Sequence, residues 1–254
     1  MKEEKMFKKY KNIGIFRLSP ENEYSNYTIS HFKKGDDYHN RFDSFPGRRH
    51  LFSLEKEVVF REASGFIDHL DFACGTGRWL SLPNTQNSYG VDVSESMLKT
   101  ARRNNPASKI FNFNFRELDE LKESSFDLIT AFRFFPNADL ELRRDAMRYI
   151  ADKLNHNGTL ILNNHRNFWS LPYIFFRFLF LGFWQAGMSH KQVVDLLESS
   201  GLRVVKSYSL GIIPQGERKA ILPWFIVNYI ERINARYFSK FHRLGYDVIY
   251  ICKK

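Results

Sequence analysis

The chain has 254 residues, of which 43% are hydrophobic and 26% charged. At roughly 150 residues per domain, this length predicts one domain, or one domain with a cap, large enough to form a core without disulfides or a structural metal. The composition excludes a wholly disordered chain. Two cysteines, Cys74 and Cys252, exclude a disulfide framework. Residues 1–11 are charged and lack the apolar stretch of a signal peptide, so we expect a cytoplasmic protein.

The net charge of +10 is unevenly distributed along the chain. Residues 67–165 carry 12 basic and 13 acidic side chains, whereas residues 166–254 carry 13 basic and 5 acidic ones. A basic excess of this kind favours an anionic partner: a membrane surface, a nucleic acid or a phosphorylated substrate. The charge alone does not distinguish these three.

Hydrophobic runs separated by turn signals predict the elements in chain order. Residues 1–60 show no clear period, Gly35 and Pro46-Gly47 act as breakers, and residues 54–63 are expected to form a short helix. The expected strands are 66–73, 88–93, 109–113, 126–132, 159–163, 202–210 and 246–252. The other expected helices are one that begins over 78–82, then 95–103, 140–154, 189–200 and 217–240. Strands that alternate with helices predict a parallel sheet with helices on both faces.

Two short motifs carry the chemical information. The first, residues 71–77 (Asp-Phe-Ala-Cys-Gly-Thr-Gly), follows the first expected strand, and Gly75 and Gly77 allow a tight turn with a ligand close to backbone N–H groups. The second, residues 90–98 (Gly-Val-Asp-Val-Ser-Glu-Ser-Met-Leu), places Asp92 at the end of the second strand. A carboxylate at that point can accept both hydroxyls of an adenosine ribose. Together the motifs predict a nucleotide-type crevice.

The residues around the motifs restrict the nucleotide. A dinucleotide fingerprint needs a third glycine at position 80, which is leucine here, and no P-loop lysine follows the glycines. Asp71 would repel a pyrophosphate but would attract an ammonium group. We therefore expect a ligand with an adenosine, no phosphate and an amino-acid end.

These motifs resemble those of the class I S-adenosylmethionine-dependent methyltransferases, of the small-molecule group called type 11. Residues 125–129 and 154–162 are similar to the fourth- and fifth-strand motifs of that family. The resemblance covers residues 66–165, and extends to 189–210. It implies an α/β fold with a doubly wound, seven-stranded, mostly parallel sheet (the Rossmann-like methyltransferase fold), a reversed last strand and helical cap elements. It also implies a cap segment over residues 1–60 and a methyltransferase domain over 61–254, with aromatic inserts at 166–188 and 215–243.

The resemblance also implies the cofactor, S-adenosylmethionine, and the residues that hold it. The expected cofactor-binding residues are Asp71, Ala73, Gly75, Gly77, Asp92, Val93, Met97, Asn114, Phe115 and Phe132. Asp71 would bind the methionine ammonium through ordered water or backbone, Asp92 the ribose hydroxyls, and Met97 the adenine ring. The residues that would line the methionine and ribose are Ala73, Gly75 and Gly77. Asn114 and Phe115 stand where the family often has Asp-Ala, and the Asn114 amide oxygen can accept the hydrogen bond of the adenine amino group.

The implied reaction is an in-line displacement at the sulfonium methyl group. Because the donor is already activated, positioning of the reacting atoms at about 3–3.5 Å does much of the work. A base helps only where the acceptor is an alcohol or ammonium that must lose a proton. The candidates at the acceptor mouth are His165, after the fifth strand, and Arg133, after the fourth; Tyr24, His31 and His39 lie in the expected cap. None is assigned as the base, and no cluster at metal-ligand spacing predicts a metal.

The two aromatic inserts leave two interpretations open. Residues 168–184 are nearly long enough to span a bilayer, but Pro172 and Arg177 oppose spanning, since an arginine at the midplane costs at least ~2.5–3.5 kcal/mol. The segment either packs on the core or on a partner subunit, or it forms an apolar lid that accepts a hydrophobic or lipid-linked acceptor or enters a membrane surface. The second insert favours a peripheral contact through 168–184 and 222–243 at the inner face of an anionic membrane. Its apolar residues 222–227 are followed by Arg232, Arg236, Lys240 and Arg243.

Three other functions compete with small-molecule methylation. An RNA methyltransferase would also use the basic charge, but the chain has no RNA-binding module, and its fourth strand ends in Phe-Arg-Phe-Phe-Pro-Asn rather than a base-methylation motif. A binding-only protein that keeps the cofactor fold is compatible with the sequence. Leu80 speaks against a nucleotide-dependent oxidoreductase. We rank a small organic acceptor above nucleic acid. Hydrophobic and lipid-linked molecules are among the acceptors considered.

Overall fold

The computed structural model describes residues 35–63, 65–116, 121, 124–180, 187–214, 222–237 and 244–254, without the side chains of 41–42, 176–180 and 235–237. The strands are β1 (Asp68–Phe72), β2 (Asn87–Asp92), β3 (Lys109–Asn112), β4 (Phe126–Ala131), β5 (Leu154–His165), β6 (Arg203–Leu210) and β7 (Asp247–Lys253). The helices are α3 (Gly35–Ser44), α4 (Pro46–Glu62), α5 (Glu95–Asn104), the 3₁₀ turn η1 (Phe135–Asn137), α6 (Leu140–Lys153), α7 (Leu171–Phe180), α8 (His190–Glu198) and α9 (Trp224–Tyr237).

The seven strands form one sheet in the order β3-β2-β1-β4-β5-β7-β6. The pairs from β3 to β5 are parallel, whereas β7 is antiparallel to both β5 and β6. The predicted doubly wound, mostly parallel sheet with a reversed last strand is therefore confirmed. Since β1 lies between β2 and β4, the order of the strands reverses beside β1, and open α/β sheets bind ligands at the carboxyl ends of strands at such a point.

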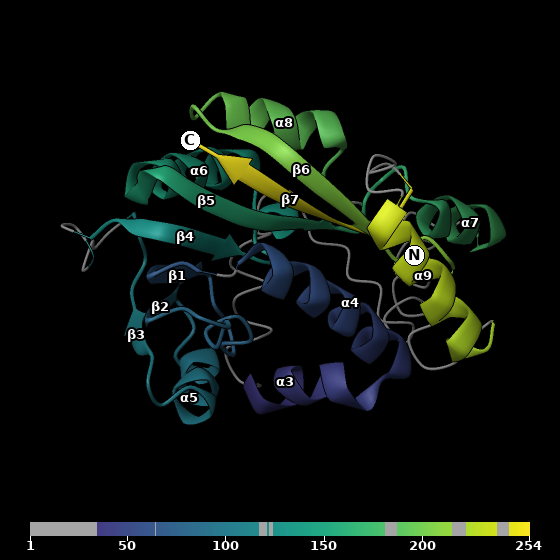
Figure 1. The fold of residues 1–254 in the computed structure, drawn as a ribbon, viewed down its shortest axis with the longest axis horizontal. Coiled ribbons are helices and arrows are strands. Elements are labelled where there is room, and N and C mark those ends of the chain that lie inside the picture. The colour runs from purple at the N-terminus through teal and green to yellow at the C-terminus, as the bar shows by residue number, and fades with distance from the viewer. Residues whose placement is uncertain are drawn as a thin grey trace, which may run out of the picture.

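Helices cover both faces of the sheet (Figure 1). Neighbouring strand residues point to opposite faces: Ile129 packs with α6 and α8, whereas Leu128 packs with α4. Both side chains are fully buried. Two hydrophobic layers thus hold the sheet rigid, which fixes the positions of the loops at its edge.

The cap region begins earlier and is more regular than expected. Gly35 begins α3, with Asp36 and Asp37 in its first turn, where acidic groups are favourable. Pro46 occupies the first turn of α4, where the missing proline N–H costs nothing, so this proline starts a helix instead of breaking one. The expectation of breakers at these two positions was wrong, because glycine and proline are tolerated at helix starts.

The helix expected from residue 78 is absent. Residues 75–80 form turns, and Pro83 follows closely. A proline restricts the residue before it and leaves too few positions for a helix to nucleate. Trp79 and Leu80 are instead buried in the core, so the segment contributes packing without helical structure.

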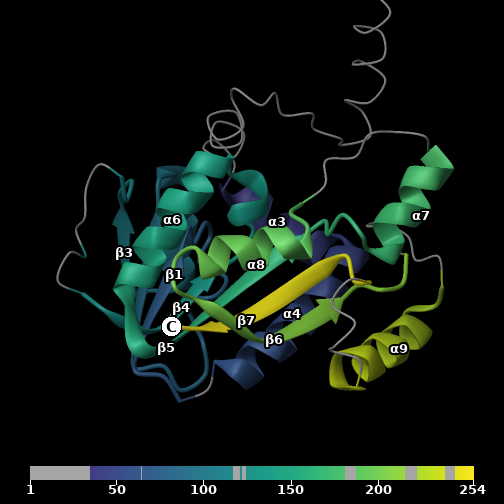
Figure 2. The same ribbon diagram turned by 90° about the horizontal axis from the view of Figure 1, so that it is seen from above.

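The inserts follow the carboxyl ends of β5 and β6. One contains α7 and the other α9, and both helices lie at the same end of the molecule in the two views (Figures 1 and 2). Their bases are joined, since the backbone N–H of Leu171 donates to the Leu244 carbonyl at 2.9 Å and that of Asn167 to the Tyr246 carbonyl at 3.0 Å. Within the described residues, no helix has the length and apolar character needed to cross a membrane.

Candidate functional site

A pocket of about 890 Å³, counted out to its open mouth, lies at the carboxyl ends of β1, β2 and β4. The residues that line it are Tyr38, Phe72, Ala73, Gly75, Val91, Asp92, Val93, Ser94, Met97, Phe113, Phe115, Phe132, Arg133, Phe134, Asn137 and Ala138. The pocket therefore occupies the edge of the sheet where the strand order predicts a ligand.

Asp92 holds the glycine turn against the end of β2. Its two carboxylate oxygens accept the backbone N–H groups of Gly75, at 2.9 Å, and Ser94, at 2.8 Å. Gly75 has a φ of 53°, and a Cβ added there would meet no atom within 4 Å. The backbone of Gly75 thus faces the open pocket. Burial raises the pKa of Asp92, while the backbone donors oppose that shift.

Gly77 has a different environment. Its φ is 75°, and an added Cβ would lie 2.7 Å from Asn105 Nδ2 and 3.0 Å from Ala101 Cβ. The Asn105 side chain also donates to the Gly77 carbonyl at 3.0 Å. Gly77 is not among the residues that line the pocket. It packs the glycine turn against the carboxyl end of α5 and so holds the turn in place without contacting the pocket.

Asp71 is buried in the sheet next to the pocket-lining Phe72 and Ala73. Its Oδ1 accepts the Thr130 hydroxyl at 2.8 Å, and Thr130 is also 2.8 Å from His69 Nε2. Its Oδ2 has no hydrogen-bond partner among the described residues. Burial raises the pKa of the Asp71 carboxyl to about 7, with a contribution from nearby Asp92.

The wall of the pocket is aromatic. The Phe72 ring lies 5.3 Å from that of Phe115 and 5.1 Å from that of Phe134. Ser94 Oγ, on the same surface, is buried without a hydrogen-bond partner among the described residues. Such a surface can stack on a planar ring and offer a hydroxyl to its polar edge.

Arg133 lines the pocket but is committed to an ion pair. Its guanidinium lies 2.5 Å from Glu55 Oε1, and its backbone N–H donates to Asn163 Oδ1 at 2.6 Å. Burial by itself lowers the pKa of Arg133, but the nearby Glu55 carboxylate has the larger effect, so the pKa of Arg133 is raised. Burial beside Glu55 raises the pKa of Asp247 well above its usual range. The guanidinium is thus a poor proton acceptor and a structural link between α4 and the sheet.

His165 and His39 are not among the residues that line the pocket. His165 Nδ1 is buried without a partner among the described residues. Burial, reinforced by Arg166, Arg133 and Arg48, holds the pKa of His165 well below its usual range. His39 Nδ1 lies 3.1 Å from the Thr76 hydroxyl, so α3 covers the glycine turn. Burial lowers the pKa of His39 as well.

The structure thus brings most of the expected cofactor residues together. Those in the pocket are Ala73, Gly75, Asp92, Val93, Met97, Phe115 and Phe132; those outside it are Asp71, Gly77 and Asn114. Asn114 Oδ1 accepts the backbone N–H of Arg116 at 3.1 Å. Tyr24 and His31 lie outside the described residues. Within these residues, no group of His, Cys, Asp and Glu could hold a metal.

Sequence reasoning gave no site role to eight of the residues that line the pocket: Tyr38, Phe72, Val91, Ser94, Phe113, Phe134, Asn137 and Ala138. Ser94 was expected only as a helix cap, and although it occupies that position it makes no side-chain capping bond. The one signal in the sequence was its place before the helix of residues 95–103, directly after the strand that ends in Asp92. Tyr38 comes from α3, for which the sequence shows no period.

Comparisons with known proteins agree with this geometry. Residues 70–162 match the model of the family described as "Methyltransferase domain". A search of curated proteins found no match. The fold is similar to that of an S-adenosylmethionine-dependent methyltransferase from Thermotoga maritima, a possible histamine N-methyltransferase, with a TM-score of 0.58, 17% identity and coverage of 88% of this chain and 97% of that one.

Two further structures contain bound S-adenosylhomocysteine. Magnesium protoporphyrin IX methyltransferase from Synechocystis PCC 6803 has a TM-score of 0.56, 13% identity and coverage of 89% and 99% of the two chains. The N-methyltransferase NodS from Bradyrhizobium japonicum has a TM-score of 0.56, 14% identity and coverage of 91% and 97%. Residues 70–162 therefore carry a methyltransferase domain, and the fold of the chain is that of the class I S-adenosylmethionine-dependent methyltransferases.

Proposed function

We propose that the pocket binds S-adenosylmethionine with its adenosine over the end of β2 and its methionine over the end of β1, and that a small organic acceptor enters beside it. The observation that carries the proposal is the hydrogen-bonded unit of Gly75, Asp92 and Ser94 facing an aromatic wall. Asp92 would receive the ribose hydroxyls on its remaining lone pairs. The adenine would lie between Met97 and the rings of Phe113 and Phe115.

The residues present fit this cofactor. The buried Ser94 hydroxyl and Asp71 Oδ2 have no partner among the described residues. A ribose or adenine edge would supply a partner to Ser94, and the ammonium group would interact with Asp71 indirectly. Ordered water or backbone would connect Asp71 to the ammonium, since Asp71 does not itself line the pocket. Gly77 would act only by holding the turn, and Val93 and Phe132 would complete the wall. Asn114 has the weakest support, because its amide oxygen already accepts from Arg116.

We assign the acceptor to the part of the pocket lined by Tyr38, Phe134 and Asn137. The aromatic walls favour an apolar body, which supports a hydrophobic or lipid-linked small molecule. The names of two structural neighbours also refer to small organic molecules, namely histamine and magnesium protoporphyrin IX. The aromatic inserts would place the protein at the inner face of a membrane, and residues 1–60 would close over the cofactor as a cap on the domain of 61–254.

The bound cofactor supplies an activated methyl group on a sulfonium. The chain then has to exclude water, align the acceptor with that methyl group and accommodate any proton that the acceptor loses. The low pKa of His165 makes it a weak base at neutral pH, and Arg133 is held protonated by Glu55. We propose that positioning by the rigid sheet edge is the main catalytic contribution, and that a proton from the acceptor passes to solvent.

Replacement of Asp92 tests the cofactor site. We expect Asp92→Ala to weaken S-adenosylhomocysteine binding at least about tenfold, because hydrogen bonds to a charged group are worth about 1.5–3 kcal/mol each. Isothermal titration calorimetry measures the change.

Asp127→Ala is the matched control. Asp127 also accepts a backbone N–H, that of Asp68 at 3.2 Å, but at the amino-terminal edge of the sheet. The Asp127→Ala chain should bind S-adenosylhomocysteine with the same affinity as the original chain. Equal losses in the two variants, or full affinity in a folded Asp92→Ala chain, would contradict the assignment.

A further inference from the structure

Helix α9 is oriented in the opposite way to an ordinary surface helix. Its inward face carries Val227, Glu231 and Asn234, which are all buried. The Glu231 carboxylate accepts the backbone N–H groups of Gly211 and Ile213, each at 3.0 Å, and Asn234 Nδ2 donates to the Ser209 carbonyl at 2.6 Å. The helix is therefore attached to the end of β6 largely through polar groups.

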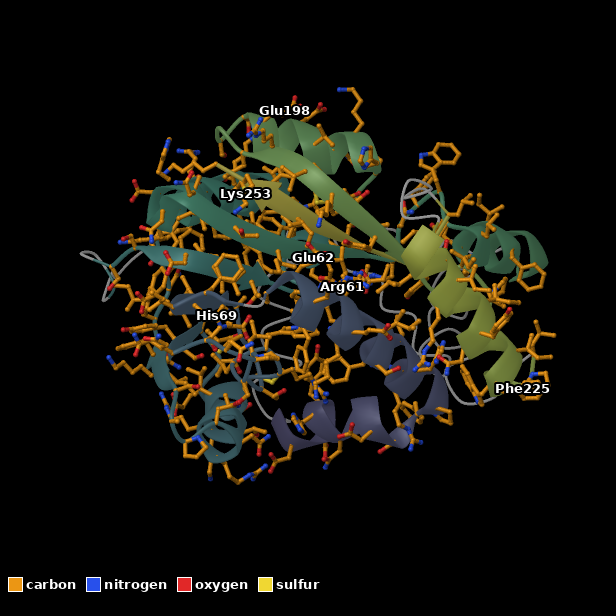
Figure 3. The ribbon with its side chains drawn as sticks, viewed as in Figure 1. Arg61, Glu62, His69, Glu198, Phe225 and Lys253 are labelled. Carbon is orange, nitrogen blue, oxygen red and sulfur yellow. The ribbon has the colours of Figure 1, made fainter. Side chains whose placement is uncertain are left out.

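The opposite face of α9 exposes large apolar side chains. Phe225 is 76% exposed and Tyr229 is 69% exposed, with Ile226 and Ile230 beside them. Figure 3 shows Phe225 at the outer end of the helix, pointing away from the rest of the molecule. A soluble surface helix normally presents its polar face to water and its apolar face to the core. An apolar surface of this kind marks a site of interaction.

A second group of exposed apolar side chains lies on the other insert, around helix α7. Trp169, just before the helix, is 56% exposed, and Ile174 within it is also exposed. Both helices lie at the same end of the molecule (Figures 1 and 2). That end holds the carboxyl ends of β5 and β6, and the pocket opens at the same edge of the sheet. We call Trp169, Ile174, Phe225, Ile226, Tyr229 and Ile230 the apolar end surface.

The charge of the inserts indicates what covers this surface. Residues 166–188 and 215–243 carry eight basic and two acidic side chains, and one of the two acidic ones is the inward-facing Glu231. Arg232, three residues after Tyr229, is exposed and lies 4.0 Å from the exposed Glu57 carboxylate. Aromatic and aliphatic side chains in segments that are this rich in basic residues match an anionic lipid surface, where apolar groups enter the headgroup boundary and cations contact the phosphates.

We propose that the apolar end surface docks the protein onto an anionic membrane, with α9 lying flat in the interface and the pocket facing the lipid. This orientation would deliver a lipid-linked acceptor directly to the cofactor, and in that respect it rests on the proposed function. Docking itself depends only on the apolar end surface, so an experiment can contradict the docking proposal and the proposed function separately.

Co-sedimentation of the full chain with vesicles tests the docking. We expect binding to vesicles of phosphatidylcholine with phosphatidylserine, and much less binding to phosphatidylcholine alone or at high salt. The double variant Phe225→Ser/Tyr229→Ser should bind at least about tenfold more weakly, because it removes two large interfacial side chains. Its S-adenosylhomocysteine affinity should not change.

Ile67→Ser is the matched control, since Ile67 is half exposed but precedes β1 at the opposite edge of the sheet. It should bind vesicles like the original chain. If the original chain binds S-adenosylhomocysteine but stays in the supernatant with phosphatidylserine vesicles, the docking proposal is wrong. A dimer in light scattering that the double variant dissociates, without vesicle binding, would assign the surface to a second copy instead. Vesicle binding without cofactor binding would support docking and contradict the cofactor site.

Discussion

Asp71 shows how one residue can serve the site without lining it. Its carboxyl is buried beside the pocket wall, with one oxygen on Thr130 and the other without a partner among the described residues. Burial raises its pKa to about 7 from an ordinary value of 3.8. The folded chain thus retains a proton that the unfolded chain loses above about pH 4, so Asp71 lowers the stability as the pH rises from about 4 to about 7.

Cofactor affinity should increase as the pH rises, whereas the contribution of Asp71 to stability decreases. An ammonium group favours the ionised Asp71, so the affinity for S-adenosylhomocysteine should increase about tenfold from about pH 6 to about pH 8, as the ionised fraction increases. Calorimetric titrations at several pH values measure this.

Two comparisons isolate the contribution of Asp71. Asp71→Asn should remove most of the pH dependence, because the amide does not titrate. Methylthioadenosine, which lacks the amino-acid end, should bind equally at each pH. A tenfold pH dependence that persists in Asp71→Asn would assign the titration to another group.

Among the elements, α4 is connected to the sheet by a buried ion pair as well as by apolar packing. Leu54, Val58 and Val59 pack on one face of the sheet, and Glu55 pairs with Arg133 after β4. Asp247 of β7 lies beside this pair and accepts from Asn163 at 3.0 Å. Loss of one charge from such a pair leaves the other buried and uncompensated.

Arg133→Leu should therefore reduce stability as well as activity. We expect a loss of about 3–5 kcal/mol in the free energy of unfolding, the usual cost of removing one partner of a buried pair. Urea denaturation measures it. The double variant Glu55→Leu/Arg133→Leu should recover most of this loss, because no charge is then left alone. An Arg133→Leu chain of normal stability that binds cofactor but has no turnover would instead give Arg133 a direct role in the reaction.

At the scale of the whole molecule, the pocket joins distant parts of the chain. Its walls come from α3, from the ends of β1 and β2, and from the segment after β4. A ligand that contacts all of them stabilises the folded chain relative to the unfolded one.

Thermal denaturation should show this coupling. S-adenosylhomocysteine at about 100 times its Kd adds about 2.7 kcal/mol, which for a domain of about 250 residues raises Tm by about 5–10 °C. NADH should cause no shift, because Leu80 stands where a dinucleotide site needs glycine. A shift with NADH and none with S-adenosylhomocysteine would favour an oxidoreductase.

Local patterns in the sequence were sufficient for the sheet and for the glycine turn. Alternating strand and helix signals predict all seven strands, since apolar periodicity and turn residues act over a few positions. Gly75 and Asp92 are close because two consecutive parallel strands end at the same edge. Local signals failed where the effect of a residue depends on its position within a helix. Gly35 and Pro46, expected as breakers, each begin a helix.

Long-range packing decided the rest. That Gly77 faces α5 while Gly75 faces the pocket depends on Asn105 and Ala101, residues well separated from the turn. The Arg133–Glu55 pair joins positions 78 residues apart, and no short-range pattern encodes it. The outward face of α9 is likewise set by its polar contacts with the end of β6. The sequence by itself determined the fold and the methyltransferase domain, because these depend on short motifs and local periodicity. Only the tertiary structure decided which of these side chains meet in the pocket and which surface is left apolar, because those depend on contacts between distant segments.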